Sequence, residues 1–260
     1  MKNFISRRIY FLILSTSGFL AVLFVWGVFA RTTNSLLLPT PRETLLALDN
    51  LLYSGELYNN LFITVKRTFL GYGTALITGI LLSLLLHKNS LLQLIFKPLI
   101  TVIQTTPPVI WIVLAVIWFG IAEDLTPIFL IFIVTFPIIF INLFEGLKDI
   151  NEDLIEMARV YNWSKKQIYL HIYYPALIPY LVSAISIGFA FAWKSSIFAE
   201  FVGSSSGVGF ALSMANSNLQ TAKLFAWAII LVILMLIIEY IIIKPVQKRV
   251  TRWRKDGQNT

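Results

Sequence analysis

Residues 144–180 of the chain read FEGLKDINEDLIEMARVYNWSKKQIYLHIYYPALIPY, a polar and charged stretch set between long apolar runs. A helix needs roughly 20 apolar residues to cross a bilayer core about 30 Å thick, so the flanking runs predict membrane spans. The polar stretch is therefore expected to lie in water at one membrane face, where it meets a soluble partner.

The composition indicates a membrane protein and excludes a soluble domain of this size. Of the 260 residues, 57% are hydrophobic and 13% are charged, and the mean hydropathy is +0.78. Together with the long uncharged runs, these values predict an all-α polytopic membrane protein. The absence of cysteine excludes disulfides, thiolate metal sites and a cysteine nucleophile.

Six apolar segments are long enough to span the membrane, and we expect them to form one domain over residues 1–260. They cover residues 9–30, 68–86, 98–118, 125–143, 176–193 and 224–243. The first segment is uncharged over 22 residues, whereas the apolar part of a cleaved signal peptide has about 7–15. It is therefore expected to remain as a span.

The distribution of basic residues predicts the orientation. A cytoplasmic N-terminus places both termini, the segment near 87–97 and the loop 144–175 inside, as the positive-inside rule requires. The 15 of 21 lysines and arginines that then lie inside are Lys2, Arg7, Arg8, Lys88, Lys97, Lys148, Arg159, Lys165, Lys166, Lys244, Lys248, Arg249, Arg252, Arg254 and Lys255. The net charge of +8 is thus interpreted as a topology signal and as attraction to anionic lipid. Nucleic-acid binding by the basic tail 248–255 is the weaker alternative, because the tail directly follows a span.

The only sizeable extracytoplasmic segment predicted is 31–66, and it contains a signal for the start of a helix. Pro39, Thr40 and Pro41 precede Arg42 and Glu43, a pattern typical of a turn that leads into a helix. A short surface helix is expected over 42–53.

The polar loop predicts two short helices separated by a turn. An apolar stripe at helical spacing lies beside a set of acids. The stripe is Leu147, Ile150, Leu154, Ile155, Ala158 and Tyr161, and the acids are Asp149, Glu152, Asp153 and Glu156. Asn162 then suits a left-handed backbone, and Ser164 with Gln167 matches a capping box that restarts a helix. Pro175 is expected to open the fifth span.

Two interpretations of this loop remain open. A short helix held outside the bilayer is suited to transmit force to a soluble partner, whereas an amphipathic helix also fits a position on lipid headgroups. The four acidic residues disfavour contact with an anionic leaflet.

The same loop resembles the EAA loop of binding-protein-dependent ABC importer permeases. The family pattern is Glu-Ala-Ala, three residues, Gly, nine residues and Ile-x-Leu-Pro. The positions that match are Glu156, Ala158, Ile172 and Pro175, and those that depart are Met157, Asn162 and Tyr174. The change from Gly to Asn is mild, because both residues tolerate a positive φ.

Further motifs extend the resemblance over nearly the whole chain, to the nitrate, taurine and alkanesulfonate group. They are residues 64–71 (TVKRTFLG), Lys97-Pro98, Thr106-Pro107-Pro108, Trp118-Phe119-Gly120, Phe136-Pro137, and residues 192–200 with Gly207-Val208-Gly209. Each motif alone is weak, and their order and spacing make the set specific.

The resemblance implies a permease subunit of an ABC importer that forms the translocation pathway by alternating access. It implies a second copy of the permease, two ATP-binding subunits and an extracytoplasmic substrate-binding protein, with a small solute such as nitrate, a sulfonate or taurine. It also implies that the loop is a coupling helix whose Glu156 docks on the ATPase. Met157, Ala158, Asn162, Ile172 and Pro175 belong to the same motif.

The chain lacks the GxxxxGK[ST] phosphate loop that ATP binding would require. ATP and Mg²⁺ are therefore expected in a partner subunit, and this chain is expected to be a transport subunit with no enzymatic activity and no cofactor. Neither His87 nor His171 has a metal-ligand partner at helical spacing, so no metal site is expected.

Polar residues within the predicted spans are candidates for lining the pathway, because such groups tend to face water or the bundle interior. Gln104, Thr105 and Thr106 precede Pro107 and Pro108, and two prolines in mid-span predict a broken third helix. The break either lines the pathway or is a packing kink satisfied by its own threonine hydroxyls.

The fifth span supplies the other pore-lining candidates, Lys194, Ser195, Ser196 and Glu200. Lys194 is expected to attract an anionic solute near the outer mouth, to extend to lipid headgroups, or to pair with Glu200. Residues 203–209 predict a turn between a re-entrant hairpin and residues 210–214, a candidate gate. Ser183, Ser186 and Gly188 are expected at a close helix contact.

Two other classes of protein fit less well. An ion-coupled secondary transporter would show acids within spans or inverted repeats, and Glu239 is the only carboxylate expected within a span. A membrane enzyme would need a cluster of nucleophile, base or metal ligands at one membrane face, which the sequence lacks.

Overall fold

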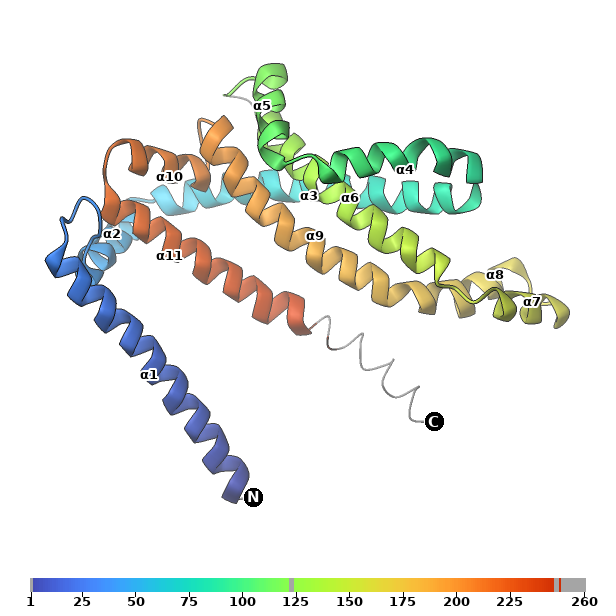
Figure 1. Cartoon of the computed structure of the whole chain (residues 1–260), viewed down its shortest axis with the longest axis horizontal. Helices are drawn as coiled ribbons and strands as arrows, with labels where there is room; N and C mark the ends of the chain where they lie inside the picture. The colour runs from blue at the N-terminus through green and yellow to red at the C-terminus, as the bar shows by residue number, and fades with distance from the viewer. Residues whose placement is uncertain (1, 122–123, 246–247, 249–260) are drawn as a thin grey trace. The chain divides into compact units, whose positions relative to one another are not determined.

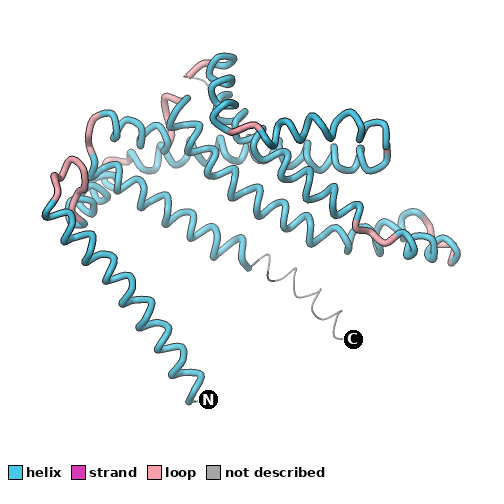
Figure 2. Tube along the Cα trace, in the orientation of Figure 1, coloured by secondary structure: helices cyan, strands magenta, loops and turns pink. Residues whose placement is uncertain are grey.

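The computed structural model describes residues 2–121, 124–245 and 248 of the chain. The described residues are helical along most of their length and are joined by short loops, with no strand among them (Figure 2). They divide into two compact units. The first comprises the described residues up to Tyr58 with Ala211–Val232, and the second comprises Asn59–Phe210 with the described residues from Ile233 onward.

The first unit is built around a capped surface helix. It contains α1 (Lys2–Thr32), α2 (Pro41–Tyr53), the first residues of α3 (Glu56–Lys88), most of α10 (Val208–Ser217) and most of α11 (Thr221–Ile237). The Thr40 hydroxyl accepts the Glu43 N–H at 3.3 Å, and the Glu43 carboxylate accepts the Thr40 N–H at 2.8 Å. This capping box satisfies two backbone donors at the start of α2. The helix predicted over 42–53 is therefore confirmed.

The second unit contains most of the helices of the chain, both apolar and polar. They are the rest of α3, α4 (Ser90–Thr105), α5 (Pro108–Phe119), α6 (Leu125–Lys148), α7 (Glu152–Val160), α8 (Lys165–Ile168), the π-helical turn η1 (Tyr169–Tyr173), α9 (Tyr174–Gly203), the start of α10, the end of α11 and the π-helical turn η2 (Ile238–Ile243). Helices α6 and α9 lie side by side and make the most extensive contact between helices (Figure 1).

Glycines allow α3 and α9 to approach α6 closely. A Cβ added at Gly71 or Gly79 would lie within 3 Å of Ile131 or Ile139, and one at Gly188 would lie 3.2 Å from Ile139. Both isoleucines are fully buried. Small residues at such contacts let membrane helices gain van der Waals packing that lipid does not replace. The close contact predicted at Gly188 is confirmed.

The candidate membrane spans agree only partly with the six that the sequence predicts. Within the described part of the chain, four helices are long and apolar enough to cross a membrane, namely Glu56–Lys88, Leu125–Lys148, Lys165–Gly203 and Thr221–Ile241. The pair α4 and α5 adds a fifth if the two form one span. The predicted third span is this pair, bent by 98° at the prolines. In the first predicted span, the described apolar helix is the shorter Leu20–Thr32.

The helix of the fifth predicted span is longer than the predicted span, because α9 continues to Gly203 and includes Glu200. The prediction that Glu239 is the only carboxylate within a span rests on the shorter span 176–193, which ends before Glu200. Of the predicted basic tail 248–255, all but Lys248 lies outside the described residues.

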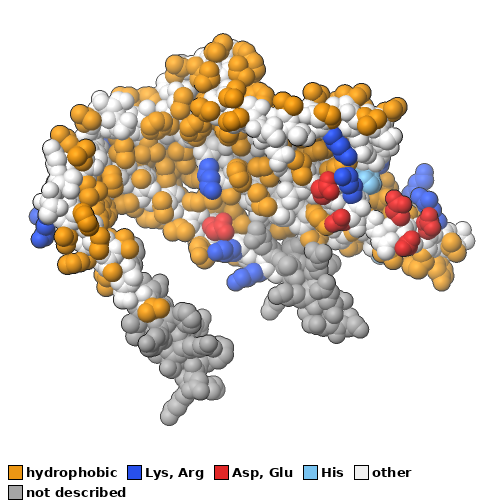
Figure 3. All heavy atoms as spheres, in the orientation of Figure 1, with side chains coloured by type: hydrophobic (Ala, Val, Ile, Leu, Met, Phe, Trp, Pro, Cys, Tyr) orange, Lys and Arg blue, Asp and Glu red, His pale blue; other side chains and the backbone are white. Residues whose placement is uncertain are grey.

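Side-chain chemistry differs along the second unit. Hydrophobic side chains cover the visible face of α5, and acidic and basic side chains gather at the end where α7 and α8 lie (Figure 3). Exposed apolar residues on α5 include Val109, Ile110, Val113 and Ile117. Such faces are suited to lipid, whereas the charged end is suited to water.

Candidate functional site

The polar loop after α6 folds as α7, a tight turn and α8. The Asn151 side chain caps α7 by accepting the Asp153 N–H at 2.8 Å. Asn162 has a φ of +55°, and the Trp163 N–H donates to the Ala158 carbonyl at 2.9 Å, which closes the end of α7. Ser164 and Gln167 form the capping box of α8. The predicted left-handed turn and helix restart are both confirmed.

The base of this loop is fixed to α9. The Tyr180 hydroxyl donates to the Asp149 carboxylate, and the Tyr180 ring lies so close to Gly146 that a Cβ there would overlap it. Ala158 faces inward and is 2% exposed. The end of α6, which directly precedes α7, is therefore packed closely against α9.

The outer face of α7 is apolar and acidic. Leu154, Met157 and Val160 recur every three residues and are 46%, 53% and 79% exposed, and Glu156 is also exposed. Two residues of the predicted apolar stripe are thus open to solvent, because Tyr161 is also exposed, at 72%. An exposed apolar strip on a short polar helix is typical of a surface that a partner covers.

The remaining residues of the EAA-like motif follow in order along the chain. Ile172 lies in the π-helical turn η1 and is partly buried. Pro175 lies in the first turn of α9, directly after the π-helical turn η1.

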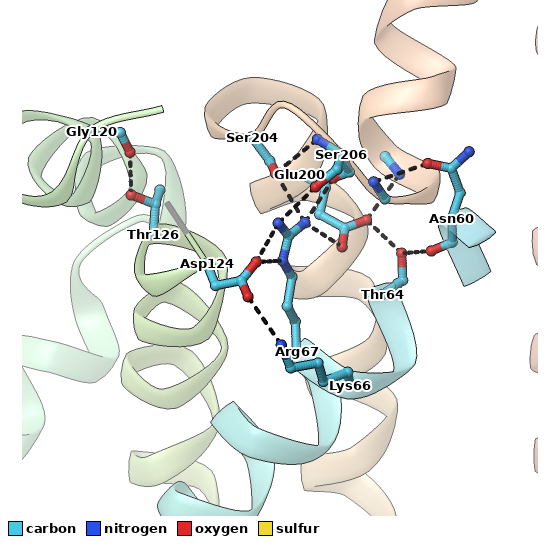
Figure 4. A network of polar contacts seen from close by, with 12 residues as sticks. Asn60, Thr64, Lys66, Arg67, Gly120, Asp124, Thr126, Glu200, Ser204 and Ser206 are labelled. Carbon is cyan, nitrogen blue, oxygen red and sulfur yellow. Dashed lines mark hydrogen bonds and ion pairs between the residues drawn. The ribbon is translucent and has the colours of Figure 1, made fainter. Parts of the chain in front are cut away.

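A second polar site surrounds the buried guanidinium of Arg67 on α3, which is 1% exposed (Figure 4). Its Nε donates to Asp124 at 2.8 Å, and its Nη1 lies 3.2 Å from Glu200. Further donations reach the Ser204 hydroxyl at 2.9 Å and the Ser206 carbonyl at 2.7 Å. Arg67 thus binds the start of α6, the end of α9 and the turn that follows α9.

The Glu200 carboxylate is completely buried and is the centre of this site. It accepts the Thr64 hydroxyl at 2.7 Å and the Gly209 N–H at 3.1 Å. Gly207 has a φ of +100°, and a Cβ at this position would overlap the Glu200 carboxylate. The turn between α9 and α10, predicted as a candidate gate, is thus held against α3 in this structure.

Asp124 lies at the exposed edge of the same site, immediately before α6. Hydrogen bonds from Arg67 lower the pKa of Asp124 despite its partial desolvation. Lys66 also approaches Asp124 at 3.3 Å. The positive charges of Arg67 and Lys66 therefore balance the negative charges of Asp124 and Glu200 in this site.

The pore-lining candidates on α9 lie in different environments. Ser195 is 8% exposed, and Ser196 is fully buried, whereas Lys194 is exposed. The Lys194 ammonium lies 5.7 Å from the centroid of the Phe191 ring. The alternative in which Lys194 pairs with Glu200 is wrong, because Glu200 pairs with Arg67.

The break between α4 and α5 is partly satisfied by its own side chains. The Thr105 hydroxyl donates to the Thr101 carbonyl at 2.9 Å, and the Thr106 hydroxyl donates to the Val102 carbonyl at 2.7 Å. This agrees with the kink alternative for the two threonines. The Gln104 side chain is exposed.

Arg67, Thr64 and Asp124 are absent from the site residues that the sequence predicts, although residues 64–71 form one of its motifs. One feature of the sequence does indicate the pairing of Arg67 with Glu200. Arg67 begins one apolar run and Glu200 ends another, and opposite charges near membrane depth usually pair.

The fold and its two polar sites define a class of protein. It is a polytopic helical membrane protein that carries an exposed, anchored helix after the C-terminal end of α6 and a buried ion-pair network at the N-terminal end of α6. Residues 75–252 match the family model of the binding-protein-dependent transport system inner membrane component. The chain belongs to this family and is a permease subunit of an ABC importer.

Curated relatives and solved structures agree with this assignment. The chain is 28% identical over 235 residues to the putative aliphatic sulfonates transport permease protein SsuC of Bacillus subtilis, covering 90% of this chain and 84% of that protein. It is 26% identical to the taurine transport system permease protein TauC of Escherichia coli, covering 93% and 90%. It is 30% identical to the nitrate import permease protein NrtB of Synechocystis sp. over 64% of this chain and 60% of that protein.

The fold is also similar to that of a chain from the inward-facing MetNI methionine ABC transporter. The TM-score is 0.61 at 20% identity, and the match covers 73% of this chain and 93% of that chain. At this identity the likeness concerns the fold alone.

Proposed function

We propose that this permease forms the translocation pathway for a small solute that carries an oxyanion, and that α7 couples the pathway to an ATP-binding subunit. The observation that carries the coupling role is the exposed strip of Met157 and Val160 beside Glu156, on a helix anchored through Ala158. The family membership supports the same role.

The assembly in this proposal contains two permease chains, two ATP-binding subunits that bind ATP and Mg²⁺, and an extracytoplasmic substrate-binding protein. Both termini and the loop 144–175 lie on the cytoplasmic side, in agreement with the excess of lysine and arginine there. ATP hydrolysis takes place in the partner subunit, because this chain has no phosphate loop.

The mechanism is alternating access driven through α7. Closure of the ATP-binding subunits on ATP brings the two α7 helices together. The movement reaches the end of α6, which directly precedes α7, and the contacts of Asp149 and Gly146 with Tyr180 transfer it to α9. Helices α6 and α9 then move as one body, since they pack tightly along their length.

The solute class follows from relatives whose names refer to aliphatic sulfonates, taurine and nitrate. Each of these solutes carries an oxyanion. We assign to Lys194 the role of binding this oxyanion, because an exposed ammonium within a span needs water or an anion as a partner. Among the described ion pairs, none involves Lys194.

The first experiment is an affinity pull-down of the tagged chain from solubilised membranes of its native host, with mass spectrometry of the recovered proteins. The expected result is an ATP-binding subunit in equal ratio to the permease, lost in Glu156→Lys and retained in the control Asp153→Lys, which changes an exposed acid on the same helix. Recovery of the folded chain alone would favour the ion-coupled secondary transporter.

A transport assay tests the solute class. Membrane vesicles that contain the complex and its binding protein should take up taurine, an alkanesulfonate or nitrate when ATP is supplied. Lys194→Met should lower uptake of the anion about tenfold or more, because removal of a charge-assisted contact weakens binding by about 1.5–3 kcal/mol. An unchanged rate would assign Lys194 to the lipid headgroups.

A further inference from the structure

The first unit contains a pocket of about 590 Å³ beside α2. Eight of its lining residues are polar or charged, namely Ser35, Glu43, Asn50, Ser54, Glu56, Gln220, Thr221 and Lys223. They come from the loop before α2, from α2 itself, from the turn before α3 and the first residue of α3, and from the turn before α11 and the start of α11. In the proposed orientation these segments are extracytoplasmic.

The pocket walls are held by contacts between distant parts of the chain. The Thr221 hydroxyl donates to the Leu36 carbonyl at 2.7 Å, across 185 residues of sequence. The Trp26 indole donates to the Pro39 carbonyl at 3.0 Å and stacks on Phe225. A recess that is held on several sides is largely formed before a ligand arrives, which lowers the entropy lost on binding.

The charges of the pocket favour a cationic guest. The Lys223 ammonium is 2.8 Å from the Glu56 carboxylate, so these two charges balance. The Glu43 carboxylate accepts the Thr40 N–H, and no ion pair is formed by Glu43 within the described part of the chain. One negative charge is left over, and the amide and hydroxyl oxygens of Asn50 and Ser54 supply further acceptors.

The pocket also has an unusual apolar residue, Leu219. It has a φ of +55° and is 67% exposed, at the position after α10 where glycine or asparagine is usual. A bulky side chain in this conformation is strained, and such residues cluster at functional contacts. Leu219 thus presents an apolar contact beside a recess for a cation.

We infer that this pocket docks the substrate-binding protein by taking one of its lysine or arginine side chains beside Glu43, while Leu219 packs against the surrounding surface of that protein. The inference rests on the proposed function, since the family depends on a binding protein. A charged recess next to an exposed apolar side chain is suited to an anchor residue of a protein partner.

The test is a titration of ATP hydrolysis by the permease and ATP-binding complex in liposomes. The probe is the substrate-binding protein recovered in the pull-down. Glu43→Gln keeps the capping box, because Gln also serves at this position, and it should raise the half-saturating concentration of binding protein about threefold. Glu43→Lys should raise it about tenfold, because it places like charges together.

Asp49→Asn and Asp49→Lys are the matched controls, because Asp49 is an exposed acid on α2 outside the pocket lining. Both should change the half-saturating concentration less than about twofold and leave basal hydrolysis unchanged. If wild type responds and the Glu43 variants behave like the Asp49 variants, the docking pocket is wrong while the importer function stands. If wild type shows no response to the binding protein, the proposed function itself fails.

A photo-crosslinking amino acid at Leu219 in intact cells gives a second readout. The expected adduct is the substrate-binding protein, with its yield at least about fivefold lower in the Glu43→Lys background. The same probe at Leu45, an exposed α2 residue outside the lining, is the control. An adduct with lipid or with a second copy of this chain, or one insensitive to Glu43→Lys, overturns the inference.

Discussion

The Nη1 atom of Arg67 lies 3.2 Å from Oε1 of Glu200, and 2% or less of either side chain is exposed. The two residues are 133 positions apart. Their pair joins α3 to the end of α9 and, through Ser204 and Ser206, to the following turn. The two buried charges compensate each other, and the contacts of Arg67 with both serines make the position of this turn depend on α3.

The first prediction concerns removal of one charge from this pair. Arg67→Met leaves Glu200 buried without its cation and should lower the free energy of unfolding by about 3–5 kcal/mol. Thermal unfolding of the purified chain in detergent measures the change. The control is Lys66→Met, whose side chain is 53% exposed and which should change stability by less than about 1 kcal/mol.

A double variant separates a charge effect from a loss of packing. Arg67→Met with Glu200→Gln should recover part of the lost stability, because no uncompensated charge then remains buried. Additive losses in the double-mutant cycle would show that the two side chains stabilise the fold independently and would contradict the pairing.

The second prediction concerns the turn after α9. Gly207→Ala introduces a Cβ into the space of the Glu200 carboxylate at a φ of +100°. The backbone strain and the overlap together should lower the free energy of unfolding by at least about 1–3 kcal/mol. The control is Gly73→Ala, where a Cβ meets nothing within 4 Å and where alanine favours a helix by about 0.5–1 kcal/mol. Equal unfolding temperatures for the two variants would contradict the close packing of this turn.

The third prediction is a pH dependence. Hydrogen bonds from Arg67 lower the pKa of Asp124 in the folded protein. The contribution of Asp124 to stability is therefore complete above its ordinary unfolded pKa and is lost as the pH falls through the lowered, folded pKa. Asp124→Asn should remove this acid dependence. Unfolding temperatures across an acidic pH series measure it, and parallel curves for wild type and Asp124→Asn would contradict the assignment.

The fourth prediction concerns the turn between α7 and α8. Asn162 has a φ of +55°, which Gly adopts freely and a β-branched residue adopts only with strain. Asn162→Gly should preserve the ratio of solute transported to ATP hydrolysed, whereas Asn162→Val should lower it through about 1–2 kcal/mol of strain at the turn. Both rates are measured in liposomes, and the turn would be irrelevant to coupling if Val and Gly gave the same ratio.

Much of the local structure follows from short-range sequence signals. The helix that follows Thr40, the capping box of Ser164 with Gln167 and the left-handed Asn162 were all predicted and all occur. The break at Pro107 and Pro108 likewise depends on the missing N–H groups of two adjacent residues. These features involve side chains and backbone groups within one helical turn, so neighbouring residues are sufficient to specify them.

The exposure of α7 required the three-dimensional fold. The helical period correctly indicates an amphipathic helix, but Leu154 and Tyr161 on its apolar stripe are exposed while Ala158 is buried. A short helix contacts its own chain along only part of its stripe, and the period carries no information about which part. The part that is left open is the surface that we assign to the ATP-binding subunit.

The composition and the length of the apolar segments were sufficient to predict a membrane protein, because the thickness of the bilayer sets the length of every span. The ion-pair partner of Arg67 could not be predicted in this way. Pairing it with Glu200 depends on the register of α3 against α9, and that register is set by the close approach of both helices to α6 at Gly71, Gly79 and Gly188. Packing between distant segments therefore decides which charges meet, whereas local sequence decides where each helix begins and ends.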